Sequence, residues 1–228
     1  MKLLPKAILH SGLLLLACAG AGAQAQEYKA QTAATPPPQE LSAAVRDTLA
    51  PGAIQVIGPQ GPLCEIWLRK VVPAKASPPQ ELGVAFGQIA DGTLVGALRF
   101  PREVKDYRRQ KISPGVYTLR YALIPVDGNH FVAPNRDFLL LTPAALDLDA
   151  GNVTRDALIA NSRKGTSTNH PSVWSLQPPE NAASLPAMLH VDDGDLWLVA
   201  FRVQTQAGSA APAPLVLALV VVGHAPEA

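Results

Sequence analysis

Histidine serves both proton transfer and metal binding near neutral pH, and four histidines lie beyond residue 25. They are His130, His170, His190 and His224. No two of them stand four residues apart, and the chain has no Cys-x-x-Cys, so it carries no zinc or haem motif. His130 and His170 each follow a run of polar residues that is typical of a loop. A shared site therefore requires the fold to bring these loops together, and the favoured alternative is that each histidine braces its own loop.

The polar residues around these two histidines define one candidate ligand site. Its members are Asp127, His130, Arg163, Lys164 and His170. A carboxylate, two imidazoles and two cations in one place could bind a polar ligand, or could serve a metal-dependent or hydrolytic enzyme. We assign no catalytic residue and no cofactor and leave the metal unspecified, because the chain has no Gly-x-Ser-x-Gly nucleophile motif and no metal-binding spacing.

The densest charge lies between Arg102 and Lys111, a segment with five basic and two acidic residues. Arginine forks at this density could bind a phosphate or an anionic polymer. A solvated loop between two strands is the favoured interpretation, because connecting loops run over the surface and charged residues are mostly exposed.

Two further groups have reactive side chains but are better explained by structure. Asp147, Asp149, Gly151 and Asn152 suggest part of a calcium loop, yet the glycine is misplaced and the bidentate glutamate of an EF-hand is missing. The start of a helix, with Asn152 as N-cap, explains them better. Cys64 lies within a predicted strand and is expected to be a small buried side chain rather than a nucleophile.

Residues 1–25 have the pattern of a secretory signal peptide. Lys2 and Lys6 precede an apolar centre, and small residues follow it up to Ala25. The apolar centre is shorter than the about 20 residues that a membrane-spanning helix needs. The alternative is a lipoprotein signal, in which a lipidated Cys18 tethers the chain to a membrane. We therefore predict export to the periplasm or the extracellular space, with the membrane-tethered lipoprotein as the alternative.

Charge and hydropathy restrict the partners of the exported chain. Loss of Lys2 and Lys6 from a total of 19 basic residues, against 18 acidic ones, changes the formal net charge from +1 to −1. Such near-neutrality gives no overall signal for nucleic acid. The second apolar stretch, 214–223, is also too short to span a bilayer and is typical of a buried strand. We predict no nucleic-acid partner and no transmembrane span, and expect an unknown ligand or an envelope protein as partner.

Beyond the signal the sequence predicts a tether and one domain. Residues 26–39, with three consecutive prolines, are expected to form an extended proline-rich tether. Residues 40–228 are expected to form a single mainly β domain, an antiparallel β-sandwich of about nine or ten strands with one or two short helices. The helices are expected over 40–50 and 152–164. The strands are expected at 53–57, 63–70, 82–89, 93–100, 116–124, 137–142, 172–176, 187–191, 196–205 and 215–222.

The sequence also predicts the turns between some of these strands and the faces of one of them. Residues 58–61 and the pair Asp91-Gly92 are expected to be hairpin turns. In strand 116–124, the alternation predicts that Thr118, Arg120 and Ala122 share a wet or pocket-lining face.

The segment Ile112-Ser113-Pro114-Gly115-Val116-Tyr117-Thr118-Leu119 places a Pro-Gly turn directly before an alternating strand. It resembles the strand start small-x-Gly-x-Tyr-x-Leu of prealbumin-like secreted β-sandwich modules. Residues 117–140 and 162–171 are similar to uncharacterised exported bacterial β-sandwich proteins. The resemblance implies an exported sandwich without an assigned activity. We therefore expect a non-catalytic binding or structural module of the cell envelope or extracellular space, with an enzyme around His130 and His170 as the alternative.

Overall fold

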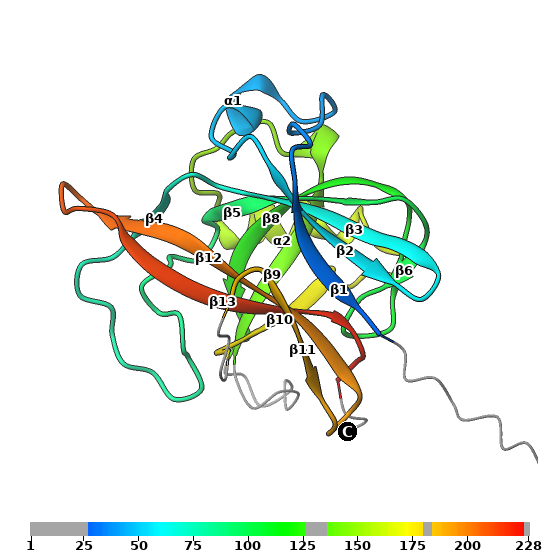
Figure 1. Cartoon of the computed structure of the whole chain (residues 1–228). Coiled ribbons are helices and arrows are strands. Elements are labelled where there is room, and N and C mark those ends of the chain that lie inside the picture. The colour runs from blue at the N-terminus through cyan, green and yellow to red at the C-terminus, as the bar shows by residue number, and fades with distance from the viewer. Residues whose placement is uncertain (1–26, 126–135, 180–183, 226–228) are drawn as a thin grey trace, which may run out of the picture.

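The computed structural model describes residues 27–125, 136–179 and 184–225 (Figure 1). Within these ranges the fold is mainly β, as predicted, with two short α-helices, α1 (Ala43–Arg46) and α2 (Arg155–Arg163), and a 3-10 helix at Ala144–Leu146. The strands are β1 (Lys29–Ala33), β2 (Ala53–Gly58), β3 (Gly61–Leu68), β4 (Val72–Ala74), β5 (Leu94–Phe100), β6 (Val104–Lys105), β7 (Lys111–Ile112), β8 (Gly115–Leu123), β9 (Asp137–Pro143), β10 (Val173–Gln177), β11 (Ala187–Val191), β12 (Leu196–Ala207) and β13 (Ala213–Val222).

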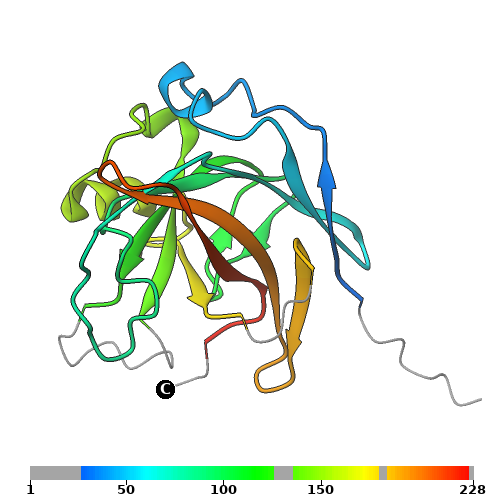
Figure 2. The ribbon, with the colours of Figure 1, turned by 60° about the vertical axis from the view of Figure 1, so that its left-hand side comes forward.

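The long strands form one hydrogen-bonded path. Its order is β1-β2-β3-β5-β8-β9-β10-β13-β12-β11, with antiparallel neighbours throughout, while β4 pairs in parallel with β12 and β6 and β7 form a separate hairpin. The path curls, so that its two ends, β1 and β11, come side by side (Figures 1 and 2). The ring of Tyr28, just before β1, lies 4.9 Å from the ring of Trp197 in β12. The expected sandwich of two sheets is not confirmed, since a single curled sheet surrounds the core.

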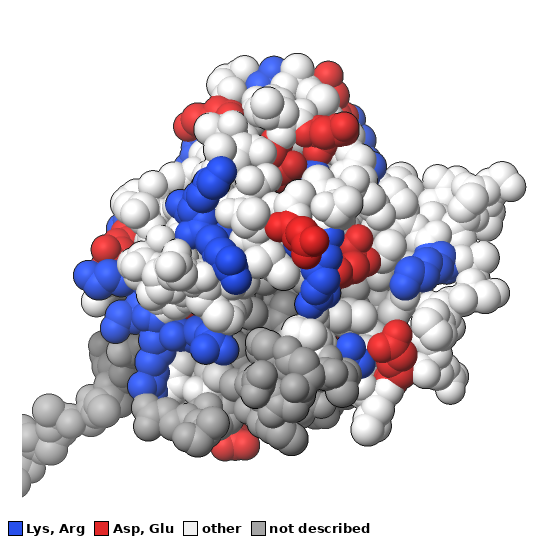
Figure 3. Space-filling view, turned by 180° about the vertical axis from the view of Figure 1, so that it is seen from behind, with Lys and Arg blue, Asp and Glu red and all other residues white. Residues whose placement is uncertain are grey.

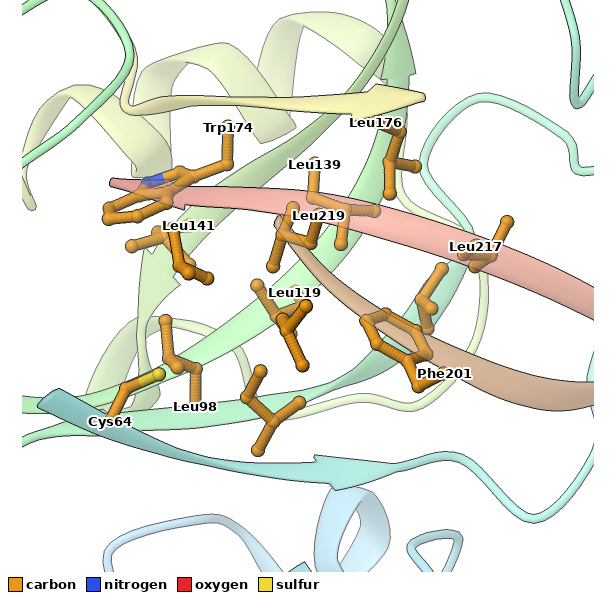
Figure 4. Close-up of a cluster of buried hydrophobic side chains, with 14 of the residues drawn as sticks. Cys64, Leu98, Leu119, Leu139, Leu141, Trp174, Leu176, Phe201, Leu217 and Leu219 are labelled. Atoms are coloured by element: carbon orange, nitrogen blue, oxygen red, sulfur yellow. The ribbon is translucent and has the colours of Figure 1, made fainter. Parts of the chain in front are cut away.

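The central core fills the inside of this curled sheet (Figure 4). Alternation along the strands turns one set of side chains inward, including Leu98 of β5, Leu119 of β8, Leu139 of β9, Phe201 of β12 and Leu219 of β13. All five are buried. The apolar area removed from water in this cluster is the main driving force for folding, at about 25 cal/mol per Å².

The outer face of the sheet is covered in two places by the helices. Val45 of α1 packs with Trp67, Leu94 and neighbouring apolar residues outside β3 and β5. Leu158 of α2 belongs to a cluster with Phe138 and other apolar residues outside β9 and β10. Figure 2 shows α2 outside the curled sheet. The central strands are therefore buried on both faces where a helix covers them, which explains their continuous apolar runs.

The segment predicted as a proline-rich tether, 26–39, belongs to the fold wherever it is described. Residues 29–33 form β1, which pairs with β2 from Lys29 opposite Ile57 to Ala33 opposite Ala53. The carbonyl oxygen of Thr35 accepts a hydrogen bond of 2.8 Å from the Trp67 indole. Hydrogen bonds to the sheet therefore hold this segment in place.

One predicted hairpin is confirmed and the other is wrong. β2 and β3 turn at residues 58–61, with Gly61 at a φ of +92°. Residues 82–89, expected to be a strand paired with 93–100, form a loop instead. Asp91-Gly92 turns the chain from that loop into β5, and Gly92 has a φ of +84°. A Cβ at Gly92 would lie 2.1 Å from the Val153 carbonyl oxygen, so the glycine is needed for close contact with the segment before α2.

Both helices are shorter than the sequence predicts. α1 covers only 43–46, with Ser42 as N-cap. α2 covers 155–163, and its N-cap is Thr154 rather than Asn152, whose side-chain oxygen instead accepts a hydrogen bond from Thr93. Neither helix in the described part of the chain is long and apolar enough to cross a membrane.

Candidate functional site

The structure brings two of the five predicted site residues to one cavity. Arg163 and His170 both line a cavity of about 310 Å³. Lys164, the C-cap of α2, is exposed and does not line it. Asp127 and His130 lie outside the described residues, as does Cys18. The structure thus brings Arg163 and His170 to one cavity and leaves Lys164 outside it, while the part of the site that falls on 126–135 stays a prediction.

The cavity lies between α2 and the outer face of β8, β9 and β10. The sheet contributes mostly apolar side chains, and so does the inner side of α2. Its lining consists of Tyr107, Arg108, Ala122, Leu123, Ile124, Pro125, Phe138, Leu140, Arg155, Leu158, Ile159, Arg163, His170, Pro171, Val173 and Ala225. Thr118, Arg120 and Ala122 were predicted to share a wet or pocket-lining face, and of these three Ala122 lines the cavity. Its small side chain leaves space beneath the helix.

Three arginines line the cavity, and only one of their guanidinium groups has a partner within residues 27–125, 136–179 and 184–225. Arg155 donates to the Asp91 carboxylate at 2.8 Å and to the Leu123 carbonyl oxygen at 2.7 Å. The guanidinium groups of Arg108 and Arg163 have no hydrogen-bond or ion-pair partner among the described residues, and both side chains are exposed. The cavity therefore combines apolar walls with two guanidiniums that no described residue engages.

His170 belongs to a tightly hydrogen-bonded loop at the edge of the cavity. Its Nδ1 lies 3.0 Å from the Pro171 carbonyl oxygen, and its carbonyl oxygen accepts a hydrogen bond from Thr166. The Thr168 hydroxyl accepts from the His170 backbone N–H and donates to Gln110. His170 thus braces its own loop, as the favoured alternative predicted, and also lines the cavity.

The segment 102–111 forms the β6–β7 hairpin, and its turn is organised around a buried carboxylate. Asp106 is 1% exposed. Its two oxygens accept four hydrogen bonds, from the backbone N–H groups of Arg108, Gln110 and Val173 and from the Gln110 side chain. Burial raises the pKa of Asp106, although these four donors act in the opposite direction. The turn fixes the backbone beside Arg108, so the basic run is not merely a solvated loop.

The same turn separates the cavity from a second, more open groove. Tyr107 and Arg108 line the cavity, whereas Asp106 and Arg109 line the groove, whose volume is about 410 Å³. Arg109 has a φ of +63° and its guanidinium lies 2.7 Å from Nε2 of His224. The groove is further lined by Tyr28, Leu63, Arg102, Glu103, Val104, Lys105, Val221, Val222, Gly223 and His224. Lysine and arginine side chains gather toward one side of the face on which α2 lies (Figure 3).

Asp147, Asp149 and Gly151, which resemble part of a calcium loop in the sequence, enclose a buried arginine. Arg120 of β8 is fully buried, and its five N–H donors bind the Asp147 carboxylate and the carbonyl oxygens of Gly92, Asp149 and Gly151. Its Nε lies 2.7 Å from Oδ2 of Asp147. The expectation that Arg120 lies on a wet face is wrong, as is the expectation that this loop is only the start of a helix, because the loop wraps a buried cation.

Two further predictions concern reactive groups. Cys64 is buried as predicted, and burial raises the pKa of its thiol, which disfavours the nucleophilic thiolate. Among the described residues, no three His, Cys, Asp or Glu side chains gather in a way that could hold a metal ion.

Sequence reasoning missed Arg155, and it considered Tyr107 and Arg108 only as part of the basic run 102–111, for which a solvated loop was favoured. An acceptor side chain two residues before Arg108, at Asp106, is a sequence signal for an organised turn and could have distinguished this basic run from a solvated loop. Arg155 and Arg163 stand eight residues apart on α2, so they lie on the same side of the helix, with Leu158 and Ile159 between them. That spacing is visible in the sequence.

Comparison of the chain with protein-family models, with curated proteins and with solved structures finds no match. The cavity and its lining residues are therefore the basis for assigning a function.

Proposed function

We propose that this chain is an exported, non-catalytic binding module whose ligand site is the cavity beneath α2. The observation that carries the proposal is the cavity itself. Its volume of about 310 Å³ is within the range of small-molecule sites, roughly 300–1,000 Å³, and its walls are mainly apolar with a few polar groups. Cavities of this size with apolar walls favour burial of an apolar ligand body.

The position of the cavity also supports binding rather than a purely structural role. Its floor is made by the side chains of a sheet buried in the core, and its opposite wall is α2, which the N-cap Thr154 holds at one end. A rigid floor reduces the ordering that a ligand must cause on binding.

A neutral apolar fluorophore, N-phenyl-1-naphthylamine, tests this function on the chain without its signal. We expect saturable binding that weakens at least tenfold in Ala122→Leu, because the larger side chain occupies the space beneath α2. Ile159→Trp, which fills the cavity from the helix side, should have the same effect. Ala157→Leu, on the exposed side of α2, is the matched control and should bind as the unsubstituted chain does. Unsaturable binding, or equal binding by all variants, would contradict the proposal.

Export is part of the same proposal and has its own test. The pattern of residues 1–25 supports removal of a signal peptide. Mass spectrometry of the chain made in a bacterial host should find a mature start at Gln24 or Gln26. An acylated Cys18 would replace this proposal with the membrane-tethered lipoprotein, and a full-length chain in the cytoplasm would contradict both.

A further inference from the structure

We infer that the ligand of the cavity beneath α2 is an amphipathic organic anion, whose apolar body lies under the helix and whose headgroup is bound by Arg163 and Arg108. This inference rests on the proposed function and adds the chemical class of the ligand. It starts from the charge of the lining. Among the described residues that line the cavity, three are arginines and none is an aspartate or a glutamate.

The hydrogen bonds of the chain distinguish these arginines. Asp91 and the Leu123 carbonyl oxygen already occupy Arg155, so its charge is largely compensated. The guanidinium groups of Arg108 and Arg163 have no partner among the described residues. A guanidinium presents five donors in a planar fork that suits carboxylate, sulfonate and phosphate groups. Two guanidinium groups at one cavity can donate hydrogen bonds to an anionic headgroup. A cationic headgroup would find no acceptor in either of them.

Arg108 and Arg163 reach the cavity from separate supports. Arg108 follows Asp106, whose buried carboxylate holds the turn through four hydrogen bonds. Arg163 is the last residue of α2. A cation there also interacts favourably with the helix dipole, but that interaction leaves its N–H donors available.

The apolar walls make a purely ionic ligand a poor match for the cavity. Phe138, Leu140 and Val173 of the sheet and Leu158 and Ile159 of α2 belong to one apolar cluster, and all five line the cavity. An inorganic anion would leave these walls without an apolar partner, and an uncharged hydrocarbon would leave the two guanidiniums without an acceptor. An amphipathic anion satisfies both, since burial of its body contributes about 0.8 kcal/mol per CH₂ group.

A series of ligands with one tail and different heads tests the inference. Calorimetric titrations would compare decanoate, decan-1-ol, decyltrimethylammonium and inorganic phosphate, each below its aggregation concentration, on the chain without its signal. We expect decanoate to bind at least tenfold more tightly than decan-1-ol, and decyltrimethylammonium and phosphate to bind more weakly than either. Arg163→Gln should remove most of the advantage of decanoate over decan-1-ol, and Lys164→Gln, one residue further along and outside the cavity, should leave it unchanged.

The outcomes separate this inference from the proposed function. Equal affinity for the three tailed compounds, which differ only in their headgroups, would overturn the charge preference while leaving the binding function in place. Tight binding of phosphate alone would overturn the amphipathic class in favour of a simple anion site. No binding of any tailed compound, together with no binding of the neutral fluorophore, would overturn both.

Discussion

Arg120 and Arg163 lie on the same outer side of the sheet but have opposite relations to the chain. Arg120 is fully buried, and the protein supplies an acceptor to each of its five donors. Arg163 lies at the edge of a cavity and receives no acceptor from the described residues. On β8 only one residue separates Arg120 from Ala122, a residue that lines that cavity. The difference indicates which arginine serves the fold and which is available for a ligand.

The second groove also differs from the cavity in how its charged side chains are paired. There the charged groups are partly engaged within the chain, since Arg102 donates to the Gln60 carbonyl oxygen, Glu103 pairs with Lys111, and Arg109 contacts His224. A cavity with apolar walls and cations that no described residue engages is a stronger candidate for a specific ligand than an open groove most of whose charged groups have partners.

The largest expected effect is on stability, at Arg120. Arg120→Met should lower the free energy of unfolding by about 3–5 kcal/mol, because it leaves the Asp147 carboxylate buried without its cation. Urea denaturation measures this change. Arg163→Gln is the matched comparison and should stay within about 0.5 kcal/mol of the unsubstituted chain, as exposed positions usually do. Similar effects at the two positions would remove the distinction between them.

Asp106 should show an intermediate effect that links stability to the cavity. Asp106→Asn replaces one carboxylate oxygen, an acceptor, by an NH₂ group, which is a donor and cannot accept from Gln110 or Val173. This change should lower the free energy of unfolding by about 2–3 kcal/mol. Because the turn positions Arg108, we also expect a smaller preference for decanoate over decan-1-ol. A variant of unchanged stability and unchanged preference would show that the turn has no such role.

Arg163 itself should affect binding and not stability. Loss of its charge-assisted hydrogen bond in Arg163→Gln should weaken decanoate binding at least tenfold, which corresponds to about 1.4 kcal/mol. Lys164→Gln serves as the control with the same charge change on the same helix end. Equal losses in the two variants would indicate a general effect of positive charge rather than a contact.

The smallest expected effect is the pH dependence from Asp106. Burial raises the pKa of this carboxyl in the folded chain, so the folded state binds its proton more tightly than the unfolded state does. The contribution of protonation to stability is therefore fully present below the ordinary pKa of 3.8 and is lost as pH rises through the raised value. The stability advantage of the unsubstituted chain over Asp106→Asn should shrink as pH rises above 3.8 and through the raised pKa. An advantage that grows with pH would contradict this sign.

The sequence allowed the strand content of the fold to be predicted well and its closure poorly. Alternation of apolar residues marks strands such as 116–124, because period two is a local property. The curling of the sheet depends on contacts between β1 and β11, far apart in sequence. The pairing of β1 with β2 is also a contact between separate segments that no local pattern reveals, so the prolines of 36–38 suggested a tether.

The candidate site was predictable only in part. Arg163 and His170 were found because they stand in polar contexts near a predicted helix end, and the structure places both on one cavity. Arg120 was misplaced because strand alternation assigns a face and does not reveal that a distant loop covers that face. The acceptors that bury its charge come from residues 92 and 147–151, which no local pattern connects to β8.

A crystal structure of the chain with bound decanoate would show where the cavity holds the headgroup and the alkyl chain. We predict that the carboxylate lies within hydrogen-bond distance of Arg163 and Arg108, with the alkyl chain between Phe138 and Ile159 beneath α2. Decanoate in the groove beside Arg109, or a carboxylate turned away from both guanidiniums, would contradict the account.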